Sequence, residues 1–548
     1  MANIRDLNRF VTTQSRLNKG RSRFPINFNV KHTFKSGYLT PLKVLEVLPG
    51  DTWDIDISSL IRSITPAAPV MDNLFADIFS FFVPNRLMCK HPDDWAKICG
   101  ENVDGAWAQT KEYTLGNTGN TSDFDGYDVK PGSLGCSIGM PIFTVPDGQG
   151  NEDFYTTMYL RGYYKIVNEY FRDQNIEAPL DFENLIDTGK WMENDSCYRA
   201  CKFHDYFTSA LPSPQKSINP VQIPLLGLAP VITGKDEFST QGMSPMKLKD
   251  SNNQPYLNGS LGVVDGSVKA GEGFVPLDTQ VNFSNLYADL SKVSGTTINQ
   301  LRLAFALQEL FEKDALYGTR YEEVLYSHFG VSPKMGVLQK PQYLGGAKIN
   351  LRTSQVVSTS ELTDGPLGSV GGLSVNSSTN KIVNNVAFEE FGAIFVMIVV
   401  RPMQTYSQGL PVMFSRNRRF DFYWPIFANL PEQAIKKQEL YFGLDHFKNI
   451  ETFGFKEAWC EYKSIPDSLL GYFSAGANDT FLSAYTYGLK LSGYPALGTA
   501  FIKSDPRQVD DTLIVKDSPY QFYADFYFSC KAYRVMPVYS VPGNLGRF

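Results

Sequence analysis

Short segments of alternating apolar and polar residues lie near both ends of this 548-residue chain. Residues 29–35, 42–48 and 53–57 alternate in the first part of the chain, and residues 521–529 (QFYADFYFS) alternate close to its end. Such alternation is typical of strands that bury one face. Strands at both ends must pair across hundreds of residues, and no long Pro/Ser linker divides the chain. The pattern therefore predicts one β architecture with large insertions, of the Greek-key sandwich type.

Other segments predict further strands of the same architecture. Residues 75–83 (FADIFSFFV) begin by alternating and become continuously apolar, as a strand does where it enters a covered core. Strands are also expected at 349–357, 381–388 and 393–400. The segment 533–541 contains Pro537 and is followed by Pro542, so we expect it at a sheet edge or in an extended arm. The chain is therefore predicted to be mainly β.

Helical pattern is mostly confined to the middle of the chain. Residues 155–175 place several tyrosines on one face, and residues 298–316 repeat leucines at helical spacing. Because strands flank these segments on both sides, we expect the helices to lie in insertions of the β architecture.

The clearest shift in composition falls at residues 225–285, which are rich in Gly and Asn and show little helical pattern. Long segments of this kind usually carry a function or are disordered, and we expect this one to contact a partner. It contains two hairpin-turn signals, Asn258-Gly259 and Asp265-Gly266. The predicted organisation is a basic N-terminal arm (1–27), a β domain with inserted helices and loops (28–224 and 286–548) and a surface-projecting insertion (225–285).

Basic residues are concentrated at the N-terminus. Residues 1–35 contain eight Lys and Arg and one Asp, so they carry a net charge of +7. The whole chain carries −6, which leaves −13 for the other 513 residues. A flexible basic arm on an acidic body suits contact with a polyanion such as nucleic acid. Attachment to a neighbouring subunit is the alternative, and the two roles are compatible.

The chain is poor in charged residues (20%) and rich in aromatic residues (14%). Interface cores have this composition, so it favours burial against neighbouring molecules. The longest apolar run has eight residues, whereas a membrane-spanning helix needs about 20, and we expect no membrane insertion. The N-terminus lacks the apolar region of a signal peptide. The seven scattered cysteines predict a protein kept in a reducing cytoplasm.

No catalytic, phosphate-binding or nucleophile motif in the sequence is convincing. Cys197, Cys201 and His204 form the best metal-ligand cluster, but a structural zinc site needs four ligands, and buried thiols are the alternative explanation. Residues 123–128 (DFDGYD) resemble part of a calcium loop, although the glycine comes too early for an EF-hand. We therefore expect no enzyme activity, no cofactor and no metal site.

Several longer stretches of sequence follow one another in a characteristic order. They are residues 65–73 (TPAAPVMDN), 81–87 (FFVPNRL), 168–175 (NEYFRDQN), 205–216 (DYFTSALPSPQK), 318–321 (GTRY) and 340–346 (KPQYLGG). With these stretches the chain closely resembles the major capsid protein of gokushoviruses, small single-stranded DNA bacteriophages of the microvirus group. The resemblance spans nearly the full length of the chain and rests on several long stretches of sequence, so it is more specific than any single motif.

The resemblance implies an eight-stranded antiparallel jelly roll with large loop and helical insertions. It implies that copies of the chain self-assemble into a T=1 icosahedral shell around a circular single-stranded DNA genome, in the cytoplasm of the host bacterium. The implied partners are a small basic DNA-binding phage protein and a minor capsid or pilot protein. A receptor on the host surface is also implied, contacted by the insertion near the three-fold axes.

Candidate contact residues lie in the arm, near the C-terminus and in the turns of the insertion. The candidates for DNA contact, which would read phosphate and not sequence, are Arg5, Arg9, Arg16, Lys19, Arg21, Arg23, Lys531 and Arg534. The candidates for host contact are Asn258, Gly259, Asp265 and Gly266. The alternative function is a β-sandwich protein that binds or cleaves carbohydrate. Cleavage would require two carboxylates close together in a cleft.

Overall fold

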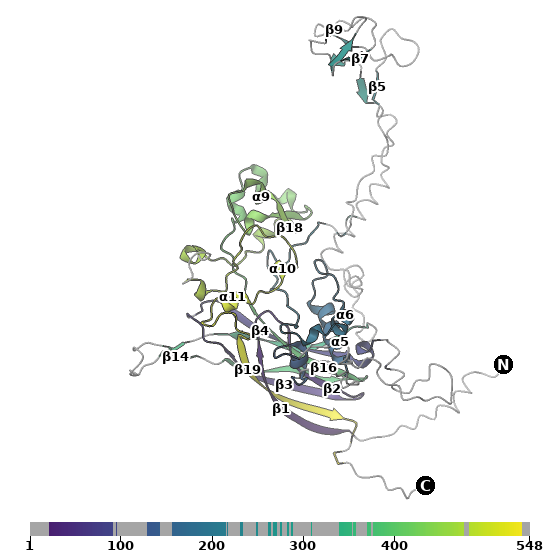
Figure 1. Ribbon diagram of the computed structural model, residues 1–548, viewed down its shortest axis with the longest axis vertical. Helices are drawn as coiled ribbons and strands as arrows, with labels where there is room; N and C mark the ends of the chain where they lie inside the picture. The colour runs from purple at the N-terminus through teal and green to yellow at the C-terminus, as the bar shows by residue number, and fades with distance from the viewer. Residues whose placement is uncertain are drawn as a thin grey trace, which may run out of the picture. The chain divides into compact units, whose positions relative to one another are not determined.

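A computed structural model of the chain is shown in Figure 1. It describes residues 21–90 except 69, residue 95, 129–142, 156–214, 216, 339–352, 355–357, 370–373, 376–475 and 482–539 except 537, with residue 308 and short strand segments between 231 and 288. The chain divides into two compact units, one formed by Met1–Pro214 with Arg320–Phe548 and the other by Gln215–Thr319. Among the described residues no helix is both long and apolar enough to cross a membrane.

Two four-stranded antiparallel sheets form the body of the first unit (Figure 1). The first sheet has the order β1-β19-β3-β15, with strands Ser22–Phe34, Phe522–Arg534, Thr52–Ser63 and Asn376–Ala387. The second has the order β12-β4-β16-β2, with strands Gln342–Leu351, Leu74–Pro84, Gly392–Pro402 and Thr40–Val47. Taken in chain order, the eight strands of these two sheets alternate from one sheet to the other, except that β4 and β12, which follow one another, both belong to the second sheet. These eight strands form the jelly roll, and shorter strands outside the two sheets raise the total above eight.

The pairing of β1 with β19 joins the two ends of the chain. Phe28 lies opposite Phe528, and the two rings stack with centroids 4.8 Å apart. Along β1 half-buried residues alternate with exposed ones, as the sequence pattern predicts. β1 already begins at Ser22, so the last six residues of the predicted arm belong to this strand. The Greek-key prediction of long-range pairing is therefore confirmed.

The main core lies between the two sheets. Trp53, Ile55 and Ile57 on β3 face inward and are almost fully buried, and they belong to the same apolar cluster as Ile394 and Val396 on β16. Because the side chains of a strand alternate in direction, the other residues of β16 face away from this core. A second cluster covers that opposite face.

A helical layer packs on the outer face of the second sheet. Phe395 and Met397 of β16 and Phe81 of β4 are buried there against α5 (Met158–Ile166). A Cβ atom at Gly162 would lie 2.6 Å from the Phe395 ring, so glycine permits the close approach of helix and sheet. The same layer contains α2 (Asn85–Met88), α4 (Leu134–Ile138), the π-helix η2 (Val167–Phe171), α6 (Phe182–Asp187) and η3 (Lys190–Met192). The predicted entry of residues 75–83 into a covered core is thus confirmed.

Several other expectations differ from the structure in detail. The helix expected at 155–175 is present as α5 and continues as the π-helix η2. The strand expected at 349–357 is divided between β12 and the short strand β13 (Gln355–Val357), which pairs with β14 (Val370–Leu373). The expectation of an edge or arm at 533–541 is wrong for Tyr533 and Arg534, because β19 lies between β1 and β3 and ends only at Arg534. The helix expected at 298–316 lies almost wholly outside the described residues.

A long insertion joins β16 to β19 in the first unit. Its elements are η5 (Val412–Ser415), η6 (Arg419–Asp421), η7 (Pro425–Phe427), β17 (Gln433–Lys436), η8 (Lys437–Glu439), α9 (His446–Ile450), β18 (Thr452–Lys456), η9 (Cys460–Tyr462), η10 (Gly471–Ala475), η11 (Leu482–Tyr485), α10 (Thr499–Ile502) and α11 (Arg507–Asp510). A third apolar cluster, in which Phe207 packs with Phe453 and Phe501 of the insertion, supports the insertion.

The second unit contains short antiparallel ladders. Its strands are β5 (Val231–Thr233), β6 (Leu248–Lys249), β7 (Leu261–Val264), β8 (Ser267–Ala270), β9 (Val275–Pro276), β10 (Asn282–Phe283) and β11 (Leu286–Ala288). β7 and β8 pair with Val264 opposite Ser267, as a hairpin between them requires. The predicted insertion 225–285 falls within this unit. The turn residues expected to contact the host, Asn258, Gly259, Asp265 and Gly266, lie outside the described residues.

Candidate functional site

Residues 411–434 in the β16–β19 insertion, here called the apolar segment, do not contain a single buried residue. The segment reads PVMFSRNRRFDFYWPIFANLPEQA and includes the three short helices η5, η6 and η7, none of which buries a side chain. Phe420 is 68% exposed and Ile426 is 86% exposed. Burying such a side chain contributes about 1.5–3 kcal/mol. The segment therefore holds a large amount of apolar area that this chain alone leaves in water.

The exposed apolar area continues beyond the segment. Leu444 and Phe447 on or beside α9, and Ile465 and Tyr472 further along, are also exposed. More than half of the exposed large apolar side chains in the described part of the chain lie between residues 413 and 472. We call the exposed large apolar side chains between residues 411 and 472 the apolar surface. Monomeric soluble proteins rarely expose apolar patches of this extent, so it marks a contact with another molecule.

Polar contacts hold the apolar segment in place without burying its apolar side chains. Arg416 forms an ion pair with Glu461 at 2.7 Å, and its guanidinium lies 4.4 Å from the centre of the Tyr462 ring. The Trp459 indole donates a hydrogen bond of 2.9 Å to the carbonyl of Phe427. The segment is thus anchored from the side that faces its own chain. Its opposite side is left available as a preformed surface.

A half-buried carboxyl, Glu439, lies in the same insertion. Glu439 accepts a hydrogen bond of 2.9 Å from the backbone N–H of Lys436 and one of 3.1 Å from the Tyr206 hydroxyl. Burial raises the pKa of Glu439 to about 7, against the lowering effect of these two hydrogen bonds, and the nearby negative charge of Glu461 raises it further. The insertion therefore contains a group that titrates near neutral pH.

A second exposed surface is the outer face of the first sheet, where the DNA-contact candidates Arg23 and Lys531 lie. Arg23 lies opposite Tyr533 in the β1–β19 pairing, and Lys531 lies next along the same face. Arg21 is exposed directly before β1. The remaining arm candidates, Arg5, Arg9, Arg16 and Lys19, lie outside the described residues. β1, the first strand of the chain, thus lies beside β19, the last strand.

Arg534 differs from the other candidates because its side chain is occupied. It forms an ion pair with Asp51 at 3.2 Å and donates a hydrogen bond of 2.8 Å to the carbonyl of Glu46. Its guanidinium also lies 5.0 Å from the centre of the Trp53 ring. Contact with a phosphate would require these interactions to break. Lys531 has one acidic neighbour, Asp54, at 3.7 Å and is 40% exposed.

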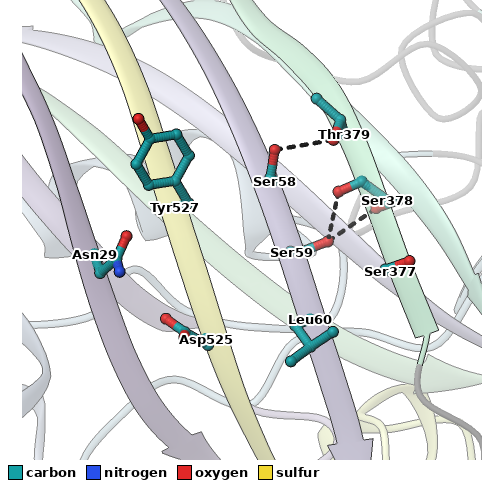
Figure 2. Close-up of a pocket in the computed structure, with 9 residues that line it drawn as sticks. All are labelled: Asn29, Ser58, Ser59, Leu60, Ser377, Ser378, Thr379, Asp525 and Tyr527. Atoms are coloured by element: carbon teal, nitrogen blue, oxygen red, sulfur yellow. Dashed lines mark hydrogen bonds between the residues drawn. The ribbon is translucent and has the colours of Figure 1, made fainter.

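A shallow depression of about 480 Å³ lies in the middle of the same face (Figure 2). Small polar side chains from β3 and β15 line much of it, and the Ser58 and Thr379 hydroxyls are joined by a hydrogen bond of 2.9 Å. The full lining is Asn29, Ser58, Ser59, Leu60, Ser377, Ser378, Thr379, Asp525 and Tyr527. Asp525 is the one carboxylate among these nine residues, so the depression lacks the pair that glycoside cleavage requires.

The predicted metal-ligand cluster does not come together as a metal site in the described residues, where no group of three or more His, Cys, Asp and Glu side chains is arranged to hold an ion. Cys197 is buried in the cluster under α5, and burial raises the pKa of its thiol to about 12. Burial also raises the pKa of Cys201 to about 11. Thiols with such pKa values stay protonated and inert at neutral pH. The acidic turn 123–128 lies outside the described residues.

An antiparallel jelly roll with a large exposed apolar surface is typical of proteins that associate with other protein chains, viral shell proteins among them. A family model described as capsid protein (F protein) matches residues 14–544 of the chain. The chain belongs to this family of capsid proteins.

Three relatives agree with this assignment. The capsid protein VP1 of Bdellovibrio phage phiMH2K is 34% identical over 540 residues, which cover 96% of each chain. The capsid protein VP1 of Chlamydia phage 1 is 33% identical over 594 residues, and that of Spiroplasma virus 4 is 32% identical over 544 residues, each match covering 95% of both chains.

The resemblance to microvirus-group capsid proteins is thereby confirmed. The chain is a structural major capsid protein, located in the virion capsid, whose copies assemble into a shell. The carbohydrate-binding or carbohydrate-cleaving alternative has no support from these relatives.

No motif or period in the sequence marks the apolar segment as a functional surface. A signal was present, because the stretch from 411 to 427 (PVMFSRNRRFDFYWPIF) is dense in aromatic residues but has neither a strand nor a helix period. Such a segment has no regular way to bury its side chains within its own chain. The overall aromatic content predicted contacts with neighbours, and the structure shows where the apolar side chains remain exposed.

Proposed function

We propose that this capsid protein closes into a T=1 icosahedral shell around a circular single-stranded DNA genome, and that the apolar surface is buried between subunits in that shell. The observation that carries the proposal is the apolar segment, in which a whole ordered stretch of 24 residues contains no buried side chain. Ordering each residue costs about 1–2 kcal/mol of backbone conformational entropy. Burial against neighbouring copies offsets that cost in the assembled shell.

The surface suits a contact between subunits rather than a contact with a small ligand. It is broad, it is rich in Phe, Trp and Tyr, and arginines lie among its aromatic rings, as in interface cores. Arg419, for example, lies 4.9 Å from the centre of the exposed Trp424 ring. Repetition of one such contact around a closed symmetry axis stabilises a container without any single strong interface.

The remaining parts of the chain receive roles in this assembly. We propose that the arm 1–27 contacts phosphate groups of the genome through Arg5, Arg9, Arg16, Lys19, Arg21 and Arg23, with Lys531 and Arg534 as weaker contributors. A small basic phage protein and a minor capsid or pilot protein are the proposed further partners. The insertion 225–285, with Asn258, Gly259, Asp265 and Gly266 at its turns, is proposed to contact a receptor on the host surface. Assembly takes place in the bacterial cytoplasm, and the protein catalyses no reaction.

The test of the shell interface is a paired substitution in the apolar segment. F420S combined with I426S replaces two exposed side chains, so protomers should keep their circular dichroism spectrum and their solubility. The same protomers should fail to form closed particles in electron micrographs and should sediment as small species. The matched control is I142S, because Ile142 is 62% exposed but lies outside the apolar surface.

The control variant should assemble like the unchanged protein. Closed particles from F420S/I426S at the yield of the unchanged chain would show that the apolar surface is not the subunit contact. The symmetry of the particles in the micrographs tests the T=1 arrangement, and nuclease-protected single-stranded DNA in purified particles tests the genome.

A further inference from the structure

Three tyrosines are exposed in a row along β19 on the outer face of the first sheet. Tyr523 is 42% exposed, Tyr527 is 43% exposed and Tyr533 is 38% exposed. The phenylalanines between them, Phe526 and Phe528, face the opposite way and are fully buried. At about 3.4 Å per residue, the first two tyrosines lie about 14 Å apart along the strand and the last two about 20 Å apart. The strand therefore presents separate aromatic rings on a surface that its neighbours leave open.

Cations flank the outer two tyrosines. Arg62 of β3 lies directly opposite Tyr523, and Arg23 of β1 lies opposite Tyr533, with its guanidinium 6.0 Å from the centre of that ring. Lys531 lies two residues before Tyr533 on the same face. Each end of the tyrosine row thus combines a stacking ring with a positive charge.

The balance of charge on this face is opposite to that of the rest of the protein. The outward-facing charged residues of the four strands are the cations Arg23, Lys31, Arg62, Lys381 and Lys531 and the acids Asp54, Asp56 and Asp525. Asp54 is already neutralised by Lys381 at 2.8 Å and Lys531 at 3.7 Å. These five cations and three acids give the face a net charge of +2, which leaves −8 for the rest of the chain. The basic arm also joins the sheet here, because β1 begins at Ser22.

The middle tyrosine borders the depression. Tyr527 stands beside a hollow formed by the small side chains of Asn29 and Ser58, and Asp525 lies on the same strand at its edge (Figure 2). The Asp525 Oδ1 atom is buried and has no hydrogen-bond partner. A buried acceptor without a donor is costly, so a ligand that brings an N–H group into the hollow would satisfy it. The exocyclic amino groups of nucleobases are donors of this kind.

We propose that the outer face of the β1-β19-β3-β15 sheet binds single-stranded nucleic acid. Unpaired bases stack on Tyr523, Tyr527 and Tyr533, and phosphate groups contact Arg23 and Arg62. A base held at Tyr527 donates from its amino group to Asp525. This inference rests on the proposed function, because it assigns the genome contact to a particular surface beyond the arm.

The observations favour this ligand over two others. A second copy of the chain would suit a dry apolar face, but this face is lined by hydroxyl, amide and charged groups, unlike the apolar surface. A neutral glycan could stack on tyrosine but would gain nothing from the arginines beside the rings. Stacking on single strands tolerates any sequence because every base has an aromatic face.

The experiment measures binding of full-length protomers to a fluorescein-labelled 20-nucleotide oligo(dT) and to a mixed-sequence single strand by fluorescence anisotropy. Each of Y523A, Y527A and Y533A should weaken binding about tenfold, as expected for the loss of one stacked base. Y527F should bind like the unchanged protein, because phenylalanine retains the stacking ring. The control is Y472A, since Tyr472 is 85% exposed but lies in the apolar surface, and it should leave binding unchanged.

Further arms of the experiment separate stacking from simple charge attraction. D525N should weaken the mixed-sequence strand more than oligo(dT), because thymine has no amino group to donate. Ultraviolet cross-links should map to tyrosines of β19 by mass spectrometry. Equal binding of a duplex and a single strand, or equal affinity of Y527A and the unchanged protein, would overturn the proposal. Binding of a soluble bacterial glycan without any oligonucleotide binding would overturn it as well.

Failure of this inference can be told apart from failure of the shell. Protomers that form closed particles but do not bind the oligonucleotides would contradict the proposed DNA binding by the outer face of the first sheet. The proposed shell would still stand. Protomers that bind the oligonucleotides through β19 but never close into particles would support DNA binding by this face and count against the proposed shell.

Discussion

The outer face of the first sheet and the apolar surface are both exposed, but they are built in opposite ways. On the sheet, regular strand pairing satisfies the backbone, and alternation sends Phe526 inward and Tyr527 outward. In the apolar segment, short helices without buried residues hold Phe420 and Ile426 in water. The first surface is stable in the protomer without a bound ligand. The second would gain stabilisation from the partner proposed for it, which suits a contact made during assembly.

The largest expected effect is the difference in stability lost when a buried phenylalanine and an exposed phenylalanine are each replaced by alanine. Phe395 of β16 is fully buried against α5, so F395A should lower the free energy of unfolding by about 3–5 kcal/mol. F420A should change protomer stability by no more than about 0.5 kcal/mol, because Phe420 is exposed. Urea unfolding of protomers measures both changes.

The milder variant F395L keeps this comparison measurable if F395A does not accumulate as folded protein. Similar losses of stability for the Phe395 and Phe420 variants would mean that the apolar segment is already packed within the protomer. That result would break the distinction between the two surfaces.

A smaller effect concerns pH and Glu439 in the same insertion as the apolar surface. The pKa of Glu439 is raised to about 7 in the folded state, whereas the ordinary value is 4.5. The unfolded chain therefore loses this proton first as the pH rises, and stability falls between about pH 4.5 and 7 and then stays low. The loss is on the order of 1–3 kcal/mol, since one pKa unit corresponds to about 1.4 kcal/mol.

The substitution E439Q should remove this part of the pH dependence. Unfolding of the unchanged protein and of E439Q is compared at pH 4.5 and pH 8, so that all other titrating groups cancel. A decrease in stability with pH that is the same in both proteins would contradict the assignment to Glu439. The outer sheet face should show no corresponding change in oligonucleotide affinity.

The smallest expected change in stability follows from a substitution in the depression on the outer face of the first sheet. The Ser58 and Thr379 hydroxyls form a cross-strand hydrogen bond on an exposed part of the sheet, so T379A should cost about 0.2–1 kcal/mol. T379S keeps the hydroxyl and is the matched control, which should unfold at the same urea concentration as the unchanged protein. A loss well above 1 kcal/mol for T379A would show that the outer face depends on its polar lining more than the geometry indicates.

Much of the sandwich follows from local pattern, and the functional surfaces follow less well. Alternation over 29–35 and 521–529 predicted β1 and β19, and the apolar run at 393–400 predicted β16. Arg534 was a reasonable DNA candidate from its charge, but its contacts with Asp51 and Trp53 depend on β19 lying next to β3. No pattern along the chain reveals that neighbour, because the two strands are separated by more than 450 residues.

The amino-acid sequence by itself determined the strand period of β1 and β19, the covered core that β4 enters and membership in a capsid family, since these depend on neighbouring residues or on several long stretches in a fixed order. Only the tertiary structure decided which aromatic residues remain exposed. Burial is a property of what packs against a side chain, and in this protein that neighbour comes from a distant part of the chain or, at the apolar surface in the shell we propose, from another copy.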